Sequence, residues 1–507
     1  MVHAVPPPAD FLLATSRATP PWHPPGARAT PTGARRGCPL VVRRAVNAAS
    51  ALLVAGCATF SPDGGRGDLE RLAAERIGPT ARALDVAAQD EAARRAFVDA
   101  RLAQALTPDT AVEVALVQQP GLQAKLAELG IAEADLVQTG RLRNPMFVYS
   151  NKRGGGIVDI ERALMINVAS LVTMPLALDL EKQRFEQAKL VAASEVVESA
   201  AAVRRAWVRA VAAQERLAYD EQVLASAEAA GELARRLAEA GNLSPLAQMR
   251  EQAFRADAAA GLARARHDVL AGRERLARLL GQPDADARLK LPARLPDPPA
   301  APLVSAVVEQ AAMDRRLDVQ VAKADTEAVA RALGLTRATR FVNVLEVGYA
   351  NTSTTGEARQ NGYEIEVELP LFDFGDAKLA RAEARYRQAL ARTADVALAA
   401  RAEVREAYSA YRTSWELAKL YRDEVVPLRK RISEEMLLRY NGMLSSVFEL
   451  LADARVQAAS VAAAIEANRD YWLAENELQL ALAGRSSPAL AAASRAAARP
   501  AESAGGH

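Results

Sequence analysis

The sequence predicts a mainly α-helical fold with a small β part, in which a long helical hairpin occurs twice in tandem. Half of the 507 residues are hydrophobic but only 5% are aromatic, and alanine, the residue with the highest helix propensity, supplies much of the apolar fraction. Two long stretches keep apolar side chains at helical spacing. Each stretch ends in the pattern Gly-x-Leu-Ser, at Gly241–Ser244 and at Gly442–Ser445, and this repetition predicts an internal duplication.

The N-terminal region predicts a lipoprotein signal. Arg43 and Arg44 precede a short apolar run that ends in Val54-Ala55-Gly56-Cys57. A basic start, a short apolar run and small residues at the end are typical of a secretory signal, and the run is too short to cross a membrane as a helix. The last four residues resemble the lipobox of bacterial lipoproteins, which implies cleavage before Cys57 and its lipidation. The alternative is a chance Ala-Gly-Cys in an alanine-rich segment.

Residues 1–40 are rich in Pro, Ala and Arg, and we expect either a disordered leader or residues upstream of the true start of translation. The signal peptide would then span residues 41–56, and residues 57–105 would form an N-terminal linker. Cys38 has no expected role. A mature chain would hold Cys57 alone and could form no internal disulfide.

The first repeat, residues 106–280, is expected to contain a helix, two strands, a long helix and a returning helix. Thr107 can cap a helix that has Pro108 in its first position. The expected elements are a helix to about Arg143 with a break at Pro120-Gly121, strands Pro145–Ser150 and Ala163–Val172, and helices Ala177–Ala240 and Pro245–Leu280. A Met-Pro-Leu sequence at Met174–Leu176 is expected to separate the second strand from the long helix.

A linker at residues 281–302 leads to the second repeat, residues 303–484, where the same order returns. The expected elements are helix Leu303–Arg340, strands Phe341–Thr352 and Gly362–Phe372, helix Asp376–Tyr440 with a kink at Pro427, and a helix that resumes after Gly442 to about Leu482. Pro370 matches Pro175 at the end of the second strand. Residues 485–507 are expected to form a disordered tail.

The two Gly-x-Leu-Ser breaks predict helical hairpin turns. Gly241 and Gly442 are each expected to end a helix as a left-handed cap, a conformation that glycine adopts without Cβ strain. Ser244 would restart the first hairpin before Pro245. In the second hairpin, Ser446 and Glu449 form a capping-box pattern.

One strand has two faces of opposite character. In YEIEVELP, four apolar side chains alternate with Glu364, Glu366 and Glu368, and alternate residues of a strand point to opposite faces. A half-buried soluble sheet would alternate in the same way. Four short strands cannot cover an apolar face, however, and a transmembrane barrel would solve this with lipid outside and water inside. Several chains would have to contribute strands, and the three glutamates would line the lumen and favour cations.

The long helices also need partners. The side chains of Val404, Tyr408, Tyr411 and Trp415 form one stripe at helical spacing, which we interpret as a helix–helix seam and not as a ligand site. Packing against copies of the chain would cover the remaining apolar seams.

The composition and motifs argue against an enzyme. His267 stands alone on an expected helix, and no Cys/His cluster has the spacing of metal ligands. The DFG at Asp373–Gly375 lacks the other kinase motifs, and RGGGI at Arg153–Ile157 lacks the Lys-Ser/Thr of a phosphate loop. We therefore expect no catalytic site, cofactor or metal. The net charge of +2, without a basic patch interleaved with aromatics, also points to no nucleic-acid partner.

Three stretches carry a resemblance to a known family. They are LTPDTAVEVALVQQPGLQA at the start of the first repeat, VELPLFDFGDAKLARAEA at the second strand-to-helix junction, and LLRYNGMLSSVFELLADARVQ at the second break. With the duplicated layout, they make residues 106–484 similar to the TolC family of outer-membrane efflux proteins, in its lipoprotein branch.

This resemblance implies a fold, partners and a place in the cell. Family members are homotrimers in which each protomer gives four strands to a twelve-stranded barrel in the outer-membrane lipid, while the helices form a tapered tunnel across the periplasm. It implies passive export, driven by an inner-membrane transporter, here expected to be of the RND type, through a periplasmic adaptor. The adaptor would dock on the two tips, at Gly241, Leu243, Ser244, Gly442, Leu444 and Ser445.

The sequence departs from the family at the expected periplasmic aperture. Many members carry aspartates six and nine residues after the tip glycine, and here these positions hold Phe448 and Leu451. Glu449 and Asp453 lie nearby and are the candidate aperture residues. Two rival functions are a periplasmic adaptor, which would have one hairpin and soluble β domains, and a structural coiled-coil lipoprotein, which gives no reason for duplicated strand pairs.

Overall fold

The computed structural model describes residues 59–282, 289–304, 315–339, 345–368 and 372–484. The chain divides into two units, Met1–Gly56 and Cys57–His507, and every described residue belongs to the second unit. The expectations for the leader, the signal peptide, Cys57, Pro370 and the C-terminal tail therefore lie outside the described residues.

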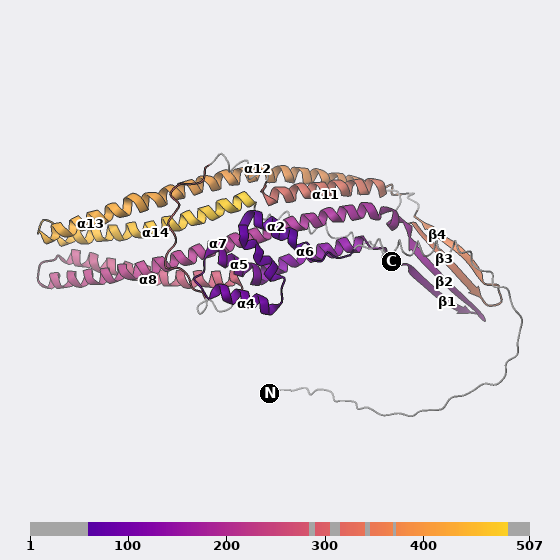
Figure 1. Cartoon of the computed structure of the whole chain (residues 1–507), viewed down its shortest axis with the longest axis horizontal. Coiled ribbons are helices and arrows are strands. Elements are labelled where there is room, and N and C mark those ends of the chain that lie inside the picture. Colours follow the sequence, from indigo (N-terminus) through magenta and orange to yellow (C-terminus); the bar gives the residue numbers. More distant parts are fainter. Residues whose placement is uncertain (1–58, 283–288, 305–314, 340–344, 369–371, 485–507) are drawn as a thin grey trace, which may run out of the picture. The chain divides into compact units, whose positions relative to one another are not determined.

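The predicted tandem order of helices and strands is confirmed (Figure 1). The first repeat consists of α5 (Pro108–Gln118), α6 (Pro120–Thr139), β1 (Met146–Gly154), β2 (Ile157–Asn167), α7 (Val168–Glu239) and α8 (Pro245–Leu280). The second consists of α11 (Leu317–Thr339), β3 (Leu345–Thr354), β4 (Gln360–Val367), α12 (Asp376–Leu420), η3 (Tyr421–Val425), α13 (Val426–Asn441) and α14 (Val447–Ala483).

Residues 57–105, expected to form an N-terminal linker, contain several helices. This stretch folds into α2 (Arg66–Ile77), the 3-10 turn η1 (Gly78–Arg82), α3 (Ala83–Ala87) and α4 (Glu91–Leu102). Leu69, Ala73 and Val98 are buried there and belong to the main hydrophobic core, together with Trp207 of α7. α2 packs against α7, whereas α3 and α4 pack against α5, and this packing supplies the stability that a short isolated helix lacks.

The start of the first repeat follows local capping rules. Thr107 caps α5, with a capping box to Thr110 and Pro108 in the first turn, as predicted. The predicted break at Pro120 is confirmed, because Gln119 takes an extended conformation between α5 and α6.

The four strands form one antiparallel sheet in the order β1-β2-β3-β4. The first hairpin turns at Gly155 and Gly156, which both have positive φ values of 57° and 83°. Both strands extend closer to the turn than predicted, β1 to Gly154 and β2 from Ile157, because a two-residue turn of glycines with positive φ suffices to connect them.

The long helix α7 corrects the prediction that residues 163–172 form a strand. Asn167 ends β2 and caps α7 by accepting a hydrogen bond from the Ser170 backbone N–H at 2.8 Å, so residues 168–172 are helical. Pro175 lies inside this helix and does not separate a strand from it. The helix has 72 residues, about 108 Å at the usual rise per residue.

The predicted distortion near Pro427 is confirmed in a specific form. The five-residue π-helical segment η3 separates α12 from α13, and Pro427 lies in the first turn of α13. A π-helical turn is a common way to accommodate a break in the backbone hydrogen-bond ladder.

Among the described helices, none is both long enough and apolar enough to cross a membrane.

The stripe on α12 packs as predicted, but its partners include the linker between the repeats. Val404, Tyr411 and Trp415 are buried, and Tyr411 and Trp415 cluster with Tyr471 of α14. The Trp415 indole N–H donates to the Pro299 carbonyl at 2.9 Å, and the Tyr408 hydroxyl donates to the Leu303 carbonyl at 3.1 Å. The stripe therefore packs helix against helix and also binds the end of the linker, at Pro299, and the first residue of the second repeat, Leu303.

Candidate functional site

The turn between α7 and α8 has the predicted geometry. Gly241 has a φ of 75°, the left-handed conformation, and the Asn242 N–H donates to the Leu237 carbonyl at 2.8 Å. This hydrogen bond closes a Schellman motif. Ser244 then caps α8, accepting a hydrogen bond from the Ala247 N–H at 3.3 Å.

The turn between α13 and α14 corrects the assignment of Gly442 as a left-handed cap. Gly442 has a φ of −81°, and the neighbouring Met443 takes the left-handed conformation with a φ of 57°. The Leu444 N–H donates to the Arg439 carbonyl at 2.8 Å. Met443 is thus the counterpart of Gly241.

The start of α14 explains why the structural counterparts in the second turn lie one residue later than the Gly-x-Leu-Ser pattern indicates. Ser446, and not Ser445, caps α14, and it forms the predicted capping box with Glu449. The counterpart of Ser244 is therefore Ser446. The second turn contains two consecutive serines, Ser445 and Ser446. The repeated Gly-x-Leu-Ser pattern pairs Ser244 with Ser445, but the serine that caps the helix is Ser446.

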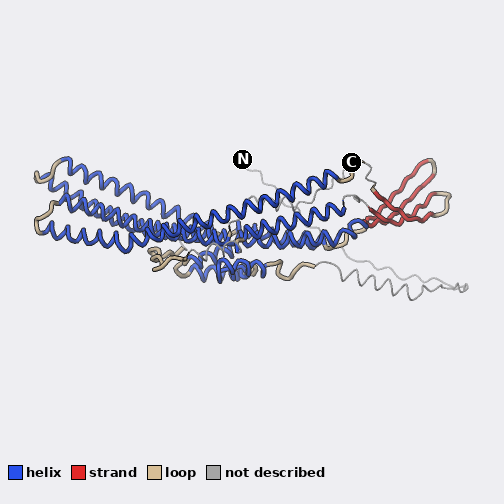
Figure 2. Tube along the Cα trace, turned by 90° about the horizontal axis from the view of Figure 1, so that it is seen from above, coloured by secondary structure: helices blue, strands red, loops and turns tan. Residues whose placement is uncertain are grey.

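The two turns lie together at the end of the helices opposite the sheet (Figures 1 and 2). The two leucines that we expect to contact an adaptor differ in exposure, because Leu243 is only 8% exposed. Leu444 and Met443 are 80% and 94% exposed. We call the exposed apolar residues at this end the tip surface: Leu246, Met249, Leu438, Met443 and Leu444.

The two candidate aperture residues differ in their surroundings. The Glu449 carboxylate accepts a hydrogen bond from the Ser446 N–H at 2.9 Å, so it stabilises the start of its own helix. Asp453 is half-buried, and its Oδ2 has no hydrogen-bond partner among the described residues.

An ion pair that sequence reasoning missed joins the two hairpins near this end. Arg455 of α14 pairs with the buried Glu251 of α8, and its guanidinium lies 4.9 Å from the centre of the Phe254 ring. The two charged residues are 204 positions apart in the sequence, and nothing local to either one indicates the partner.

The sheet confirms the predicted alternation of its two faces. Glu366 lies opposite Glu346, and Glu364 lies opposite Gly348; directly opposed residues of antiparallel strands share a face. The other face carries Tyr363, Ile365 and Val367. Glu368 follows the last residue of β4. Sequence reasoning missed Glu346, although its alternation with Leu345 and Val347 was visible.

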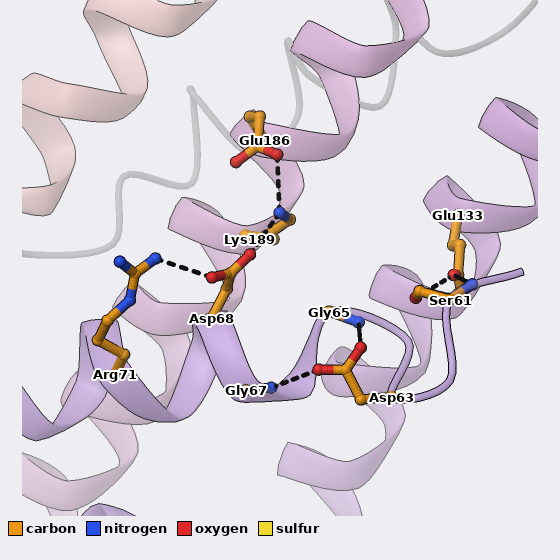
Figure 3. A network of polar contacts seen from close by, with 9 residues as sticks. All are labelled: Ser61, Asp63, Gly65, Gly67, Asp68, Arg71, Glu133, Glu186 and Lys189. Atoms are coloured by element: carbon orange, nitrogen blue, oxygen red, sulfur yellow. Dashed lines mark hydrogen bonds and ion pairs between the residues drawn. The ribbon is translucent and has the colours of Figure 1, made fainter.

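A polar network fastens the first described residues to α6 and α7 (Figure 3). The Ser61 backbone N–H donates to Glu133 of α6 at 2.6 Å. The Lys189 ammonium donates to Asp68 and to Glu186, each at 2.7 Å, and its side chain is only 8% exposed. The Asp63 carboxylate accepts the N–H groups of Gly65 and Gly67 at 3.2 and 3.0 Å. We call Ser61, Asp63, Asp68, Glu133 and Lys189 the N-terminal latch.

The stability of the N-terminal latch depends on pH, because the pKa values of its charged residues are shifted. Hydrogen bonding from Lys189 and attraction to its charge lower the pKa of Asp68. The N–H groups of Gly67 and Gly65 lower the pKa of Asp63. Burial disfavours the charged form of Lys189, but its hydrogen bonds to Asp68 and Glu186 outweigh this and raise its pKa.

We therefore expect the latch to loosen in acid. A carboxyl group with a lowered pKa stabilises the fold above its unfolded pKa of about 4, and the contribution is lost as the pH falls through the lower folded value. The protection factors of the amides of residues 59–77, which correct for the intrinsic exchange rate at each pH, should fall severalfold below about pH 4, while the core of α7 stays protected. Asp68→Asn should lower these protection factors similarly at pH 7. Glu91→Gln, in an exposed pair with Arg95, serves as the control, and equal effects of both variants would contradict the latch.

Within the described part of the chain, no group of three or more His, Cys, Asp and Glu residues is placed to hold a metal ion.

Comparisons with known proteins show which solved structures share this fold. No family model matches the chain, and no curated protein matches it in sequence. Solved structures do match. The chain is 17% identical to CusC, with a TM-score of 0.63, covering 74% of this chain and 92% of CusC. It is 17% identical to the outer membrane protein VceC of Vibrio cholerae, with a TM-score of 0.62, covering 78% and 98%.

A third match is the MtrE outer membrane channel of Neisseria gonorrhoeae, in its open state. It is 19% identical, with a TM-score of 0.61, and the match covers 74% of this chain and 88% of MtrE. These similarities span nearly the full length of each solved chain. The protein therefore has the fold of outer membrane channels, as its resemblance to the TolC family implies.

Proposed function

We propose that this chain is the protomer of an outer-membrane efflux channel that conducts its substrates passively from the periplasm to the exterior. The observation that carries the proposal is the combination of two tandem helical hairpins with one four-stranded sheet that has an exposed apolar face. A sheet with this face needs a cover of lipid or protein, since exposed apolar area in water is unfavourable. Three copies would supply twelve strands and close a barrel.

The same proposal assigns the other features. Cys57 is lipid-anchored in the outer membrane, and the helices extend into the periplasm. The tip surface docks a periplasmic adaptor, which connects the channel to an inner-membrane transporter of the RND type. The exposure of Met443 and Leu444 at the end of the hairpins supports this docking site. Glu449 and Asp453 remain the proposed aperture residues, with Glu449 committed also to its helix cap.

A rival function, that of a periplasmic adaptor, is distinguished by its oligomer and its membrane behaviour. Detergent extracts of outer membranes should contain a trimer whose electrophoretic mobility changes on heating, as the barrel unfolds. A monomer that washes off the membrane with salt would contradict the channel. Mass spectrometry of the extracted protein would test the lipid on Cys57.

The charged face of the sheet predicts cation selectivity. Glu364, Glu366, Glu368 and Glu346 lie on the proposed lumen side, and rings of carboxylates favour cations in a water-filled pore. In planar bilayers under a salt gradient, the reversal potential should indicate a severalfold preference for potassium over chloride. Replacing Glu346, Glu364 and Glu366 together by glutamine should remove most of this preference. Glu91→Gln, far from the sheet in sequence, should leave it unchanged, and unaltered selectivity of the triple variant would refute the assignment of this face to the lumen.

A further inference from the structure

The sheet has two strand edges that no other described strand covers. Its order is β1-β2-β3-β4, so β1 and β4 are each paired on one side only within the described part of the chain. An exposed edge presents a row of backbone N–H and C=O groups with which another strand can pair. β1 runs away from the helices and β4 runs back toward them (Figure 1). The β4 edge of one copy can therefore join the β1 edge of another copy as an antiparallel pair.

The two edges carry complementary charges on the face that the channel proposal assigns to the lumen. On the β4 edge, Glu364 and Glu366 lie on this face, and both are exposed. On the β1 edge, the same face carries the exposed Lys152. Among the described residues, none forms an ion pair or hydrogen bond with the Lys152 ammonium. Its facing residue on β2, Asp159, accepts a hydrogen bond from the Thr354 hydroxyl at 3.1 Å instead.

Closure of a barrel restricts the register between copies. Every copy must turn its apolar face outward, so the register shifts by an even number of residues across the four strands of one copy. With strands about 4.8 Å apart and a rise of about 3.3 Å per residue, a shift of four residues gives a strand tilt of about 35°, and a shift of six gives about 46°. Shifts of two and eight give about 19° and 54°, outside the usual range of about 35–45°. Two shifts therefore remain.

The direction of the shift follows from the handedness of the sheet. The Val158 carbonyl accepts the Thr355 N–H at 3.0 Å on the side of β3, so Val158 and its partner Arg153 on β1 form a non-hydrogen-bonded pair. For L-residues, this pairing places β1 at the right edge when the apolar face is viewed with the helices below. Adjacent strands are rotated by about −20°, so the strands lean to the right and the shift runs toward the turn that ends β1.

Only the shift of six pairs the charges at the two edges. It places Lys152 of the next copy directly opposite Glu364, and Ser150 of that copy opposite Glu366. The shift of four leaves no cation directly opposite either glutamate. Opposite charges on facing residues stabilise a strand pair, whereas like charges destabilise it. Glu366 already lies opposite Glu346 in its own chain, so a cation from the next copy relieves a repulsion that one copy alone contains.

We propose that three copies join their sheets through an ion pair between Glu364 on β4 and Lys152 on β1 of the next copy, in the register that also pairs Glu366 with Ser150. The partner is a second copy of this chain, whose lysine completes a contact that one copy leaves open. This inference rests on the proposed trimeric channel and names the contact that closes its barrel. The contact occurs once at each of the three seams between copies.

Disulfide formation tests the register while it keeps the ion pair intact. In the full-length trimer, Ser150→Cys with Glu366→Cys should link neighbouring copies and give a covalent trimer on denaturing gels without reductant. Facing residues of a non-hydrogen-bonded pair have Cα atoms about 4.5 Å apart, which suits a disulfide. Val148→Cys with Glu366→Cys, two residues out of register, is the matched control and should give severalfold less covalent trimer. The single variants should give none, which controls for Cys38 and Cys57.

The outcomes separate the seam from the channel itself. More covalent trimer with the cysteine at 148 than with the cysteine at 150 would overturn the register and the directly facing ion pair. No disulfide with either cysteine, in a trimer whose mobility still changes on heating, would overturn the contact between β1 and β4 and leave the channel intact. A chain that is monomeric in every membrane extract would refute the proposed channel.

Exchange of the two charges tests the ion pair. In Lys152→Glu, the midpoint temperature of trimer dissociation should fall by several degrees, because two glutamates then face each other across the seam. Adding Glu364→Lys should restore most of the loss. Lys152→Glu with Asp159→Lys, which restores opposite charges only within one copy, is the matched control and should restore much less. Equal recovery in the two double variants, or no recovery with Glu364→Lys, would overturn the ion pair between copies.

Discussion

Replacing Arg316 with methionine is expected to lower the free energy of unfolding by about 3–5 kcal/mol, because it leaves a buried negative charge without its partner. The Arg316 side chain is 1% exposed and pairs with Asp318 at 2.6 Å and with Glu403 at 2.8 Å. Its Nη1 also donates to the carbonyl of Ala481 at 2.7 Å. One guanidinium thus joins the start of α11 to α12 and to the end of α14.

The surroundings of this arginine leave little room for relaxation. Gly484 has a φ of 90°, and a Cβ there would lie 2.5 Å from Asp318 Oδ1 and 2.8 Å from the Leu317 nitrogen. The backbone of Gly484, at the end of α14, therefore lies directly against the buried pair. The pKa of Arg316 is raised by its bonds to Asp318 and Glu403, although burial acts in the opposite direction, so the charge persists throughout the accessible pH range.

Thermal unfolding in detergent, followed by the helical circular dichroism signal, would measure the effect. Arg412→Met is the matched control, since Arg412 forms an exposed pair with Glu416 on α12 and such pairs contribute about 0–1 kcal/mol. The double variant Arg316→Met with Asp318→Leu should regain part of the loss, because it removes the stranded charge. A single variant as stable as the control would disprove the role of the pair.

Features encoded over a few residues could be predicted from the sequence. The cap at Thr107, the break at Pro120 and the distortion at Pro427 follow from capping and proline rules. The alternation of Glu364 and Glu366 with apolar neighbours showed the two faces of the sheet. The duplicated order of elements was visible because each repeat carries its own markers.

Features formed by distant residues could not be predicted. The bonds from Ser61 to Glu133 and from Arg316 to Ala481 join positions 72 and 165 residues apart. Neither end of such a contact has a sequence signal of its own. The N-terminal helices were missed for a related reason, because their stability depends on packing against the distant α5 and α7.

Two errors arose where local signals competed. Pro175 indicated a boundary, but the Asn167 cap starts α7 earlier, and a long helix tolerates one missing hydrogen bond. Similarly, Gly442 indicated a left-handed cap, but the left-handed residue is Met443. In both turns the left-handed residue lies three positions before the serine that caps the next helix: Gly241 before Ser244, and Met443 before Ser446.

The second large effect is expected at the tip surface. Leu444→Glu should abolish export while trimers still assemble, because Leu444 is exposed and packs against nothing that the fold requires. A charge there would have to be desolvated when an adaptor covers the tip. Binding of the cognate adaptor to the detergent-solubilised trimer, and accumulation of the exported compound in cells, would measure the loss. Normal export by this variant would contradict the docking role of the turn, which would then only connect the two helices.

Three further variants separate docking from folding at the same turn. Gly442→Ala should be tolerated, because a Cβ there would meet no atom closer than 3.4 Å, and the φ of −81° at Gly442 is allowed for alanine. Met443→Gly should stabilise the turn by about 1 kcal/mol, since glycine adopts the left-handed conformation without strain. Leu243→Ala should instead destabilise the protein by about 2–5 kcal/mol, because its side chain is buried. If Met443→Gly weakens adaptor binding while it raises stability, the exposed Met443 side chain is itself part of the docking surface, whereas unchanged binding would assign docking to Leu444 and its other neighbours.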